Sequence, residues 1–176
     1  MTDATLTPSR LWKKMAFELR QRAARAFWQD EEAGDDQAQA MLLIAQQKKF
    51  RPKTVAGLDA ERKARHLASL GFVPSSIAAR ALIAYHLSEH RPMMATFLDA
   101  LGVTHENGVI KDEKVSPDPS KIGPAVDQLA QQFATEDVSL YLNTLLCQDP
   151  EAWASLRDLP AVSGELGSPG LAGQHR

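Results

Sequence analysis

The sequence predicts an all-α fold: a bundle of six to eight helices around a central apolar helix at 74–90, with a small β-hairpin near 103–111. The segment 74–90 is apolar on almost every side, and such a helix has to be surrounded by other elements. Ala, Leu and Gln are abundant, while aromatic residues make up only 6% of the 176 residues. This balance favours helix over sheet. Apolar residues near the N-terminus also recur at helical spacing.

The first helix is expected to begin near Pro8-Ser9 and to run to about Asp30. Phe17 and Trp28 lie eleven residues apart, which brings them to nearly the same angle, off the main apolar stripe. A second contact surface or a wide core contact would explain aromatics on more than one side of this helix. The apolar stripe consists of Trp12, Met15, Ala16, Leu19, Ala23, Ala26 and Phe27. The cations on the rest of the helix are Lys13, Lys14, Arg20, Arg22 and Arg25.

Two further helices precede the central one. The second helix is expected to start near Asp36, and Pro52 stops it because proline cannot continue a helix. The third spans 58–70, with Asp59 near its start and Gly71 just after its end, as is typical of helix boundaries.

The central helix, 74–90, opens with a proline and two serines. Arg91-Pro92 separates it from a fifth helix at 92–101, which Gly102 closes. The fifth helix carries five apolar side chains: Met93, Met94, Phe97, Leu98 and Leu101.

The dipeptide Asn107-Gly108 predicts a two-residue hairpin turn, because both positions tolerate a positive φ. Val103 to His105 could then pair with Val109 to Lys111. An isolated hairpin is only marginally stable, so this one should pack on helices.

The C-terminal third is predicted to form a loop at 112–121, helices near 123–134 and 136–148, and a short closing helix at 150–158. Thr135 is the expected cap of the 136–148 helix. Trp153 and Leu156 suit a closing turn that docks on the core.

We therefore expect a single helical domain over 8–158, with the loop at 112–121 as the candidate boundary between two sub-modules. Residues 160–176 are rich in Gly, Ser, Pro and Ala with little to bury, which predicts a disordered tail.

The net charge of -2 favours neither nucleic acid nor a membrane surface, but the charge is unevenly distributed. Residues 1–65 hold 13 Lys and Arg against 9 Asp and Glu, a net of +4, and the remainder holds 7 against 13, a net of -6. The one cysteine, Cys147, excludes an intramolecular disulfide. No apolar stretch is typical of a signal peptide or a membrane span, so a soluble cytoplasmic protein is expected.

The histidines include one pair at helical spacing, His86 and His90, which is half of a metal site. His105 and Glu106 could add ligands from the hairpin. A zinc site needs three or four ligands, and the sequence has neither Cys-x-x-Cys nor His-Glu-x-x-His. We therefore expect no metal and no cofactor, and these four residues remain only weak metal candidates. A structural role for His86 and a cation at the helix end for His90 are the alternatives.

No motif predicts catalysis. Cys147 follows Leu-Asn-Thr-Leu-Leu on an apolar helix, where a free cysteine behaves as a small hydrophobe. There is no Gly-x-Ser-x-Gly sequence and no glycine-rich loop after a strand. We expect no catalytic residues, and the balance is against an enzyme.

A winged-helix DNA-binding regulator is the alternative, built from the helices of 58–101 and the hairpin 103–111 as a wing. The helix 74–90 is too apolar to read a groove. Residues 66–110 also hold two Arg against Glu89, Asp99 and Glu106, a net of -1, whereas DNA binding needs a positive field.

The favoured prediction is a non-enzymatic protein–protein interaction module that uses its basic, aromatic N-terminal helix. Aromatic residues and Arg dominate the energetics of interfaces. The partner would be another protein or a second copy of the chain, and an anionic membrane surface is a less favoured option. The predicted contact residues are Trp12, Lys13, Lys14, Phe17, Arg25 and Trp28.

Overall fold

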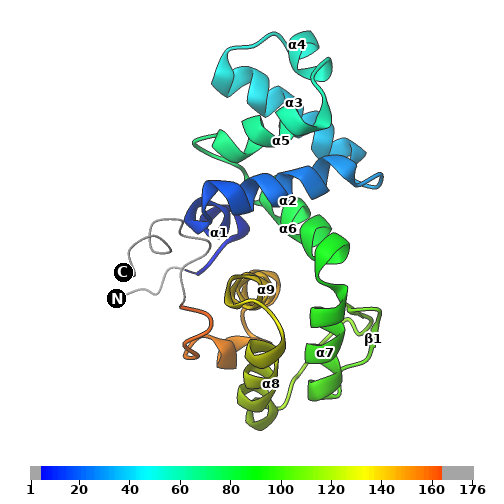
Figure 1. Ribbon diagram of the computed structural model, residues 1–176, viewed down its shortest axis with the longest axis vertical. Helices are drawn as coiled ribbons and strands as arrows, with labels where there is room; N and C mark the ends of the chain where they lie inside the picture. The colour runs from blue at the N-terminus through cyan, green and yellow to red at the C-terminus, as the bar shows by residue number, and fades with distance from the viewer. Residues whose placement is uncertain (1–4, 164–176) are drawn as a thin grey trace. The chain divides into compact units, whose positions relative to one another are not determined.

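The computed structural model describes residues 5–163 (Figure 1). Within them the chain forms nine α-helices, a two-stranded hairpin and a short 3-10 helix. The prediction of an all-α fold with a small hairpin is confirmed. The helices outnumber the predicted six to eight because the expected first helix is two helices and one five-residue helix was missed.

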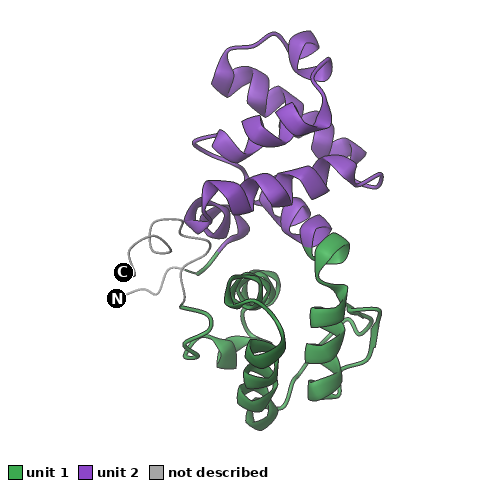
Figure 2. Ribbon diagram, viewed as in Figure 1, with its two compact units in different colours: residues 1–6, 86–166 green, residues 7–85, 167–176 purple. Residues whose placement is uncertain are grey.

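The chain divides into two compact units (Figure 2). Among the described residues, unit 2 comprises 7–85, and unit 1 comprises 86–163 together with 5–6. The division lies within helix α6 (Ser75–Glu89), between Tyr85 and His86. The loop at 112–121 lies inside unit 1. That 8–158 forms one domain stays a prediction.

Unit 2 opens with α1 (Pro8–Lys14) and α2 (Phe17–Gln29). The expected single helix over 8–30 is wrong, because Met15 and Ala16 are extended, with ψ of 145° and 155°. The Ser9 hydroxyl donates to the Val73 carbonyl at 2.7 Å, and its backbone N–H donates to Ser75 Oγ at 3.3 Å. These two bonds hold α1 against the start of α6, so α1 does not continue in the direction of α2.

Helices α3 (Gly34–Lys48), α4 (Pro52–Ala56) and α5 (Ala60–Ser69) follow. Lys49 ends α3 in the left-handed conformation with φ 58°. Pro52 was predicted only to stop a helix, but it also begins α4, because proline suits the first turn, where no N–H is needed. Asp59 caps α5 by accepting the Arg62 N–H at 2.8 Å, as its place in the sequence predicts.

The core of unit 2 lies mainly between α2 and α5. Alanines on both helices are fully buried, and their small side chains let the two backbones approach closely. The buried alanines are Ala23, Ala24, Ala64 and Ala68. The large buried side chains around them include Leu19, Phe27, Ile44, Val55 and Leu67.

Helix α6 is apolar and mostly buried, as its sequence predicts. Leu82 is 1% exposed and Tyr85 is 2% exposed, while Ile83 and Arg80 are half-buried. Arg80 Nε lies 3.3 Å from Asp30 Oδ2, so its charge has a partner within unit 2.

In unit 1, α7 (Arg91–Leu101) ends at Gly102, whose φ is 68°. The hairpin consists of β1 (His105–Glu106) and β2 (Val109–Ile110). Glu106 pairs with Val109, and the turn residues Asn107 and Gly108 have φ of 49° and 89°. The predicted turn is therefore confirmed. The predicted pairing of Val103–His105 with Val109–Lys111 is one residue out of register, because Glu106 belongs to β1 and His105 pairs with Ile110. The Arg91 guanidinium donates to the Asn107 carbonyl at 3.0 Å, which ties the hairpin to α7.

Unit 1 is completed by α8 (Pro119–Gln132), α9 (Thr135–Gln148) and the 3-10 helix η1 (Ala154–Leu156). Helix α8 begins four residues earlier than predicted, because Asp118 caps it by accepting the Ser120 N–H. The predicted cap of α9 is wrong: Thr135 is already the first helical residue, and Ala134 precedes it.

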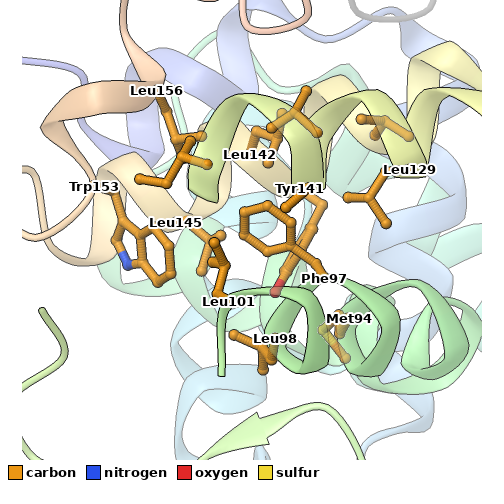
Figure 3. Close-up of a cluster of buried hydrophobic side chains, with 14 of the residues drawn as sticks. Met94, Phe97, Leu98, Leu101, Leu129, Tyr141, Leu142, Leu145, Trp153 and Leu156 are labelled. Atoms are coloured by element: carbon orange, nitrogen blue, oxygen red, sulfur yellow. The ribbon is translucent and has the colours of Figure 1, made fainter. Parts of the chain in front are cut away.

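The core of unit 1 is a cluster of aromatic and aliphatic side chains from α7, α8, α9 and η1 (Figure 3). The Phe97 ring lies 5.7 Å from Tyr141 and 5.9 Å from Trp153, measured between ring centroids. Trp153 and Leu156 dock on this core, as predicted.

Residues 160–163, assigned to the disordered tail from sequence, form turns, and Ala161 and Val162 pack on this core. The Asn143 side-chain amide donates to the Val162 carbonyl at 3.0 Å and holds the turn on α9. The remainder of the predicted tail, 164–176, lies outside the described residues. Over 5–163, no helix combines the length and the hydropathy that crossing a bilayer requires.

Candidate functional site

Four polar side chains form a buried chain of contacts in unit 1. His86 Nδ1 lies 2.9 Å from His90 Nδ1, and His86 Nε2 lies 2.9 Å from Thr144 Oγ1. His90 Nε2 lies 3.4 Å from Asp137 Oδ1. His86 lies in the last turn of α6, and His90, four residues on, is the N-cap of α7; their rings meet, and α9 supplies the other two groups. We call these four residues the histidine cluster.

The hydrogen positions in the histidine cluster follow from one bond. The Thr144 hydroxyl donates its only proton to the Leu140 carbonyl at 2.7 Å. It therefore accepts from His86 Nε2–H. Burial lowers the pKa of His86 to about 3, and His90 adds to the effect, so His86 is neutral near pH 7. Its Nδ1 then carries a lone pair and accepts from His90 Nδ1–H.

The order of groups is hydroxyl, imidazole, imidazole, carboxylate, which has the elements of an activated nucleophile. The direction of the protons argues against that chemistry. A general base must accept the proton of the hydroxyl, but here the Thr144 proton points to a backbone carbonyl of its own helix. Thr144 is also only 5% exposed, so a substrate could not reach it in this arrangement. The histidine cluster is therefore suited to holding α6 to α9 within unit 1.

The weak metal candidates are not brought together. His105 Nε2 contacts Asp99 Oδ1 at 2.6 Å, and His105 Nδ1 accepts the Gly108 N–H at 3.1 Å. Glu106 forms an ion pair with Lys111 across the hairpin. Among residues 5–163, no group of three or more His, Cys, Asp or Glu side chains could hold a metal ion. The contacts of His105 and Glu106 lie in and beside the hairpin, whereas His86 and His90 contact each other in the histidine cluster.

The predicted contact residues of the N-terminal helix have different surroundings. Trp12 is only 2% exposed, so its assignment to a partner surface is wrong: the stripe to which it belongs is core. Arg25 forms a two-pronged ion pair with Glu61 of α5, at 2.7 and 2.8 Å. Trp28 is half-buried, 5.0 Å from the Phe27 ring and with Lys63 Nζ 5.5 Å from its own ring centre. Arg25 and Trp28 thus contact unit 2 itself.

Lys13, Lys14 and Phe17 remain exposed around the junction of α1 and α2, and the Phe17 side chain is 36% exposed. They are the part of the predicted surface that a partner could reach directly. The break at Met15 and Ala16 puts the two lysines and Phe17 on different helices, so they do not form one helical face.

The largest exposed apolar side chains of unit 2 lie elsewhere: one is on α3, one follows α3 and one precedes α6. Leu42 and Phe72 are each 59% exposed, and Phe50 is 38% exposed. Gln47 Nε2 donates to the Phe72 carbonyl at 2.7 Å, which places Phe72 beside α3. Leu43 is half-buried one turn before Gln47 and on the same side of α3. Leu42 lies on a different side of α3, about 140° around the helix axis from Gln47. We call Leu42, Phe50 and Phe72 the exposed apolar residues of unit 2.

Two cations lie near His66, which contacts Phe50. The Phe50 ring packs edge-on against His66 of α5, at 5.3 Å between centroids. Burial lowers the pKa of His66, and the nearby positive charges of Lys48 and Arg65 lower it further. Lys48 and Arg65 therefore lie close enough to Phe50 and His66 to set the electrostatic potential there.

Sequence reasoning did not single out the exposed apolar residues of unit 2, because helical spacing does not show which apolar side chains distant segments leave uncovered. The signal that could have found Phe50 is the run Lys-Lys-Phe-Arg-Pro-Lys at 48–53, where an aromatic residue lies among four cations without an acidic residue.

The elements of the winged-helix alternative are divided between the units. Helix α5 and most of α6 belong to unit 2, while α7 and the hairpin belong to unit 1. The hairpin packs on α7, and α5 packs on α2 and α3. This arrangement does not support the alternative.

No protein-family profile, curated protein or solved structure matches the chain.

Proposed function

We propose that this chain is a non-enzymatic helical protein–protein interaction module and that unit 2 supplies the contact surface. The observation that carries the proposal is the exposure of large apolar side chains on unit 2: Leu42 and Phe72 are each 59% exposed, and Phe50 is 38% exposed. Exposed apolar side chains of this size are candidates for burial against a partner.

The charge of unit 2 supports the same assignment. Residues 7–85 hold 14 Lys and Arg against 8 Asp and Glu, a net of +6, while residues 86–163 hold 5 against 12, a net of -7. A unit with a net positive field speeds its encounter with anionic partners. The expected partner therefore carries an acidic surface.

The exposed remainder of the N-terminal surface, Lys13, Lys14 and Phe17, is a second contact region under this proposal. Arg25 would contribute only if its exposed ion pair with Glu61 opened, and exposed pairs of this kind contribute little to stability.

The test uses the tagged full chain as bait in an extract of its source cells, with quantitative mass spectrometry of the retained proteins. We expect at least one acidic protein to be retained by the wild type in proportion to the bait. Two matched double variants separate the regions: Leu42→Ser with Phe72→Ser, and Lys14→Glu with Phe17→Ser. Retention should fall at least about tenfold in one of them, as expected for loss of hot-spot residues.

The proposal fails if no protein is retained above a bait-free control, or if both double variants retain the same proteins as the wild type. A gel-shift series with duplex DNA at rising salt runs alongside. Retardation that weakens steeply with salt would favour the DNA-binding alternative instead.

A further inference from the structure

We propose that unit 2 binds single-stranded nucleic acid through a small aromatic and cationic patch, where the C-terminal end of α3 meets α5. We call Phe50, His66, Lys48 and Arg65 the Phe50 patch. This activity goes beyond the proposed function and does not depend on it. It requires neither the hairpin nor α7, which the winged-helix alternative needs.

Contacts between α3 and α5 bring the Phe50 patch together. The Phe50 and His66 rings lie 5.3 Å apart between centroids, with an angle of 79° between their planes. Burial lowers the pKa of His66, and the positive charges of Lys48 and Arg65 lower it further. Both cations therefore lie near this ring. Lys48 is in the last turn of α3, and Arg65 precedes His66 on α5.

The two rings of the patch are suited to stacking against a base. An edge-on contact covers at most one face of one ring, and the Phe50 side chain is 38% exposed. Its backbone is held in place, because its N–H donates to the Ala45 carbonyl at 2.9 Å after the left-handed Lys49. Aromatic side chains bind bases without regard to sequence, since every base has a π-face.

The cations around Phe50 suit phosphate groups. Its chain neighbours Lys49 and Arg51 are both exposed, and residues 48–53 contain four cations and no acid. Glu61, one turn before Arg65 on α5, accepts hydrogen bonds from Arg25 with both carboxylate oxygens. That carboxylate is therefore already engaged. A single strand carries a phosphate beside every base, so one nucleotide can meet both the aromatic and the cationic parts of the patch.

Other anionic partners would use only part of the patch. A duplex keeps its bases stacked on one another, and an acidic peptide offers carboxylates without a base to stack on Phe50. A membrane surface requires a wide apolar face. Phe50 is the one large apolar side chain of the patch, and the helix that follows it, α4, has only five residues.

The test is fluorescence anisotropy of the full chain with labelled oligonucleotides of about 12 residues, within the usual site sizes for single strands. The probes are a single-stranded RNA, a DNA of the same sequence, its duplex, and an abasic DNA strand with the same phosphates. Polyglutamate and phosphatidylserine vesicles complete the set. We expect RNA or DNA single strands to bind at least about tenfold more tightly than the abasic strand or the duplex.

Aromatic variants separate stacking from simple apolar contact. Phe50→Leu keeps an apolar side chain but removes the ring, and it should raise the Kd for the single strand about tenfold. Phe50→Trp should bind at least as tightly as the wild type. Phe17→Leu is the matched control, because Phe17 is 36% exposed, and it should leave the Kd within about twofold. Circular dichroism checks that each variant is folded.

Charge variants locate the phosphates and remain informative if a Phe50 variant does not fold. Arg51→Gln with Arg65→Gln should raise the Kd about tenfold. It should also reduce the slope of log Kd against log salt by about 1.4, since each lost phosphate contact on a single strand contributes about 0.7. Lys13→Gln with Lys14→Gln changes the net charge equally on α1 and should change the slope clearly less.

Binding of the abasic strand or the duplex as tightly as the single strands would overturn the inference, because stacking would then contribute nothing. Tighter binding of polyglutamate or of the vesicles would assign the patch to acidic proteins or to membranes and would also overturn it. So would a Kd that Phe50→Leu and the arginine double variant leave unchanged. The extract experiment can succeed or fail independently, because its variants lie outside the Phe50 patch.

Discussion

His86 is a buried histidine in unit 1, only 3% exposed. Its ring lies between His90, Thr144 and the Tyr141 ring, which is 5.6 Å away between centroids. Burial disfavours the charged form of the ring and lowers the pKa of His86. His90 lowers this pKa further, and the Asp137 carboxylate partly offsets the effect of burial.

The first prediction concerns pH. The pKa of His86 is lowered to about 3 in the folded chain, against about 6.5 when unfolded. Between these two values the unfolded chain binds more protons than the folded chain. The stabilising contribution of the neutral His86 ring is therefore fully present above about pH 6.5 and is lost as the pH falls below that value. Lowering the pH from about 7 to about 5 should cost about 2 kcal/mol through this one group.

Urea unfolding of the full chain at the two pH values measures this loss. His86→Gln removes the titrating ring and should reduce the loss by about 2 kcal/mol, even if the variant is less stable at both pH values. His105→Gln, in the hairpin and outside the histidine cluster, is the control and should leave the loss nearly unchanged. An unaltered pH dependence in His86→Gln would contradict the assignment.

At the scale of single elements, the hairpin depends on one glycine. Gly108 has φ 89°, and a Cβ there would lie 2.9 Å from Met94 Cβ and 3.3 Å from the Arg91 carbonyl oxygen. Positive φ is strained for residues other than glycine, and the close approach to α7 leaves no room for a methyl group. Gly108 is therefore needed both for the turn conformation and for the close packing of the hairpin on α7.

The second prediction compares two glycines. Gly108→Ala should destabilise the chain by about 3 kcal/mol, because it adds a clash to the backbone strain. Gly102→Ala is matched in φ, at 68°, but has no atom within 4 Å of the new Cβ. It should cost only about 1 kcal/mol. Chemical unfolding of both variants measures the difference in their free energies of unfolding. Equal losses of stability would show that the contact with Met94 does not destabilise Gly108→Ala.

At the scale of the whole molecule, the small net charge of -2 conceals two units of opposite sign. Unit 2 has a net charge of +6 and unit 1 of -7 over the described residues. A charged surface interacts with the local charge of each unit more than with the net charge of the whole chain. The reason is that interactions between exposed charges are screened beyond about 10 Å at moderate salt.

The third prediction follows from this separation. Near pH 7 the full chain should be retained on a cation exchanger at low salt, although its net charge is negative. Arg51→Glu with Lys53→Glu should elute at clearly lower salt. Lys111→Glu with Lys114→Glu makes the same change of net charge in unit 1 and should shift elution less. Elution of the wild type in the flow-through, or equal shifts for the two double variants, would contradict a unit-based charge separation.

The sequence by itself determined the helical class, the hairpin turn and most helix ends, because these depend on local chemistry. Asn107-Gly108 allows the turn, Asp59 caps its helix, and Gly102 ends another, each through bonds within a few residues. The apolar character of α6 was also evident without any partner. Such features need no knowledge of which distant segments meet.

Only the tertiary structure decided which apolar and charged side chains are covered. Trp12 and Leu42 both lie on helices with apolar residues at suitable spacing, yet one is 2% exposed and the other 59%. Likewise, Glu61 reaches Arg25 and Thr144 reaches His86 across 36 and 58 residues of sequence. Burial and partnership depend on contacts between distant segments, and periodicity along one helix contains no information about them.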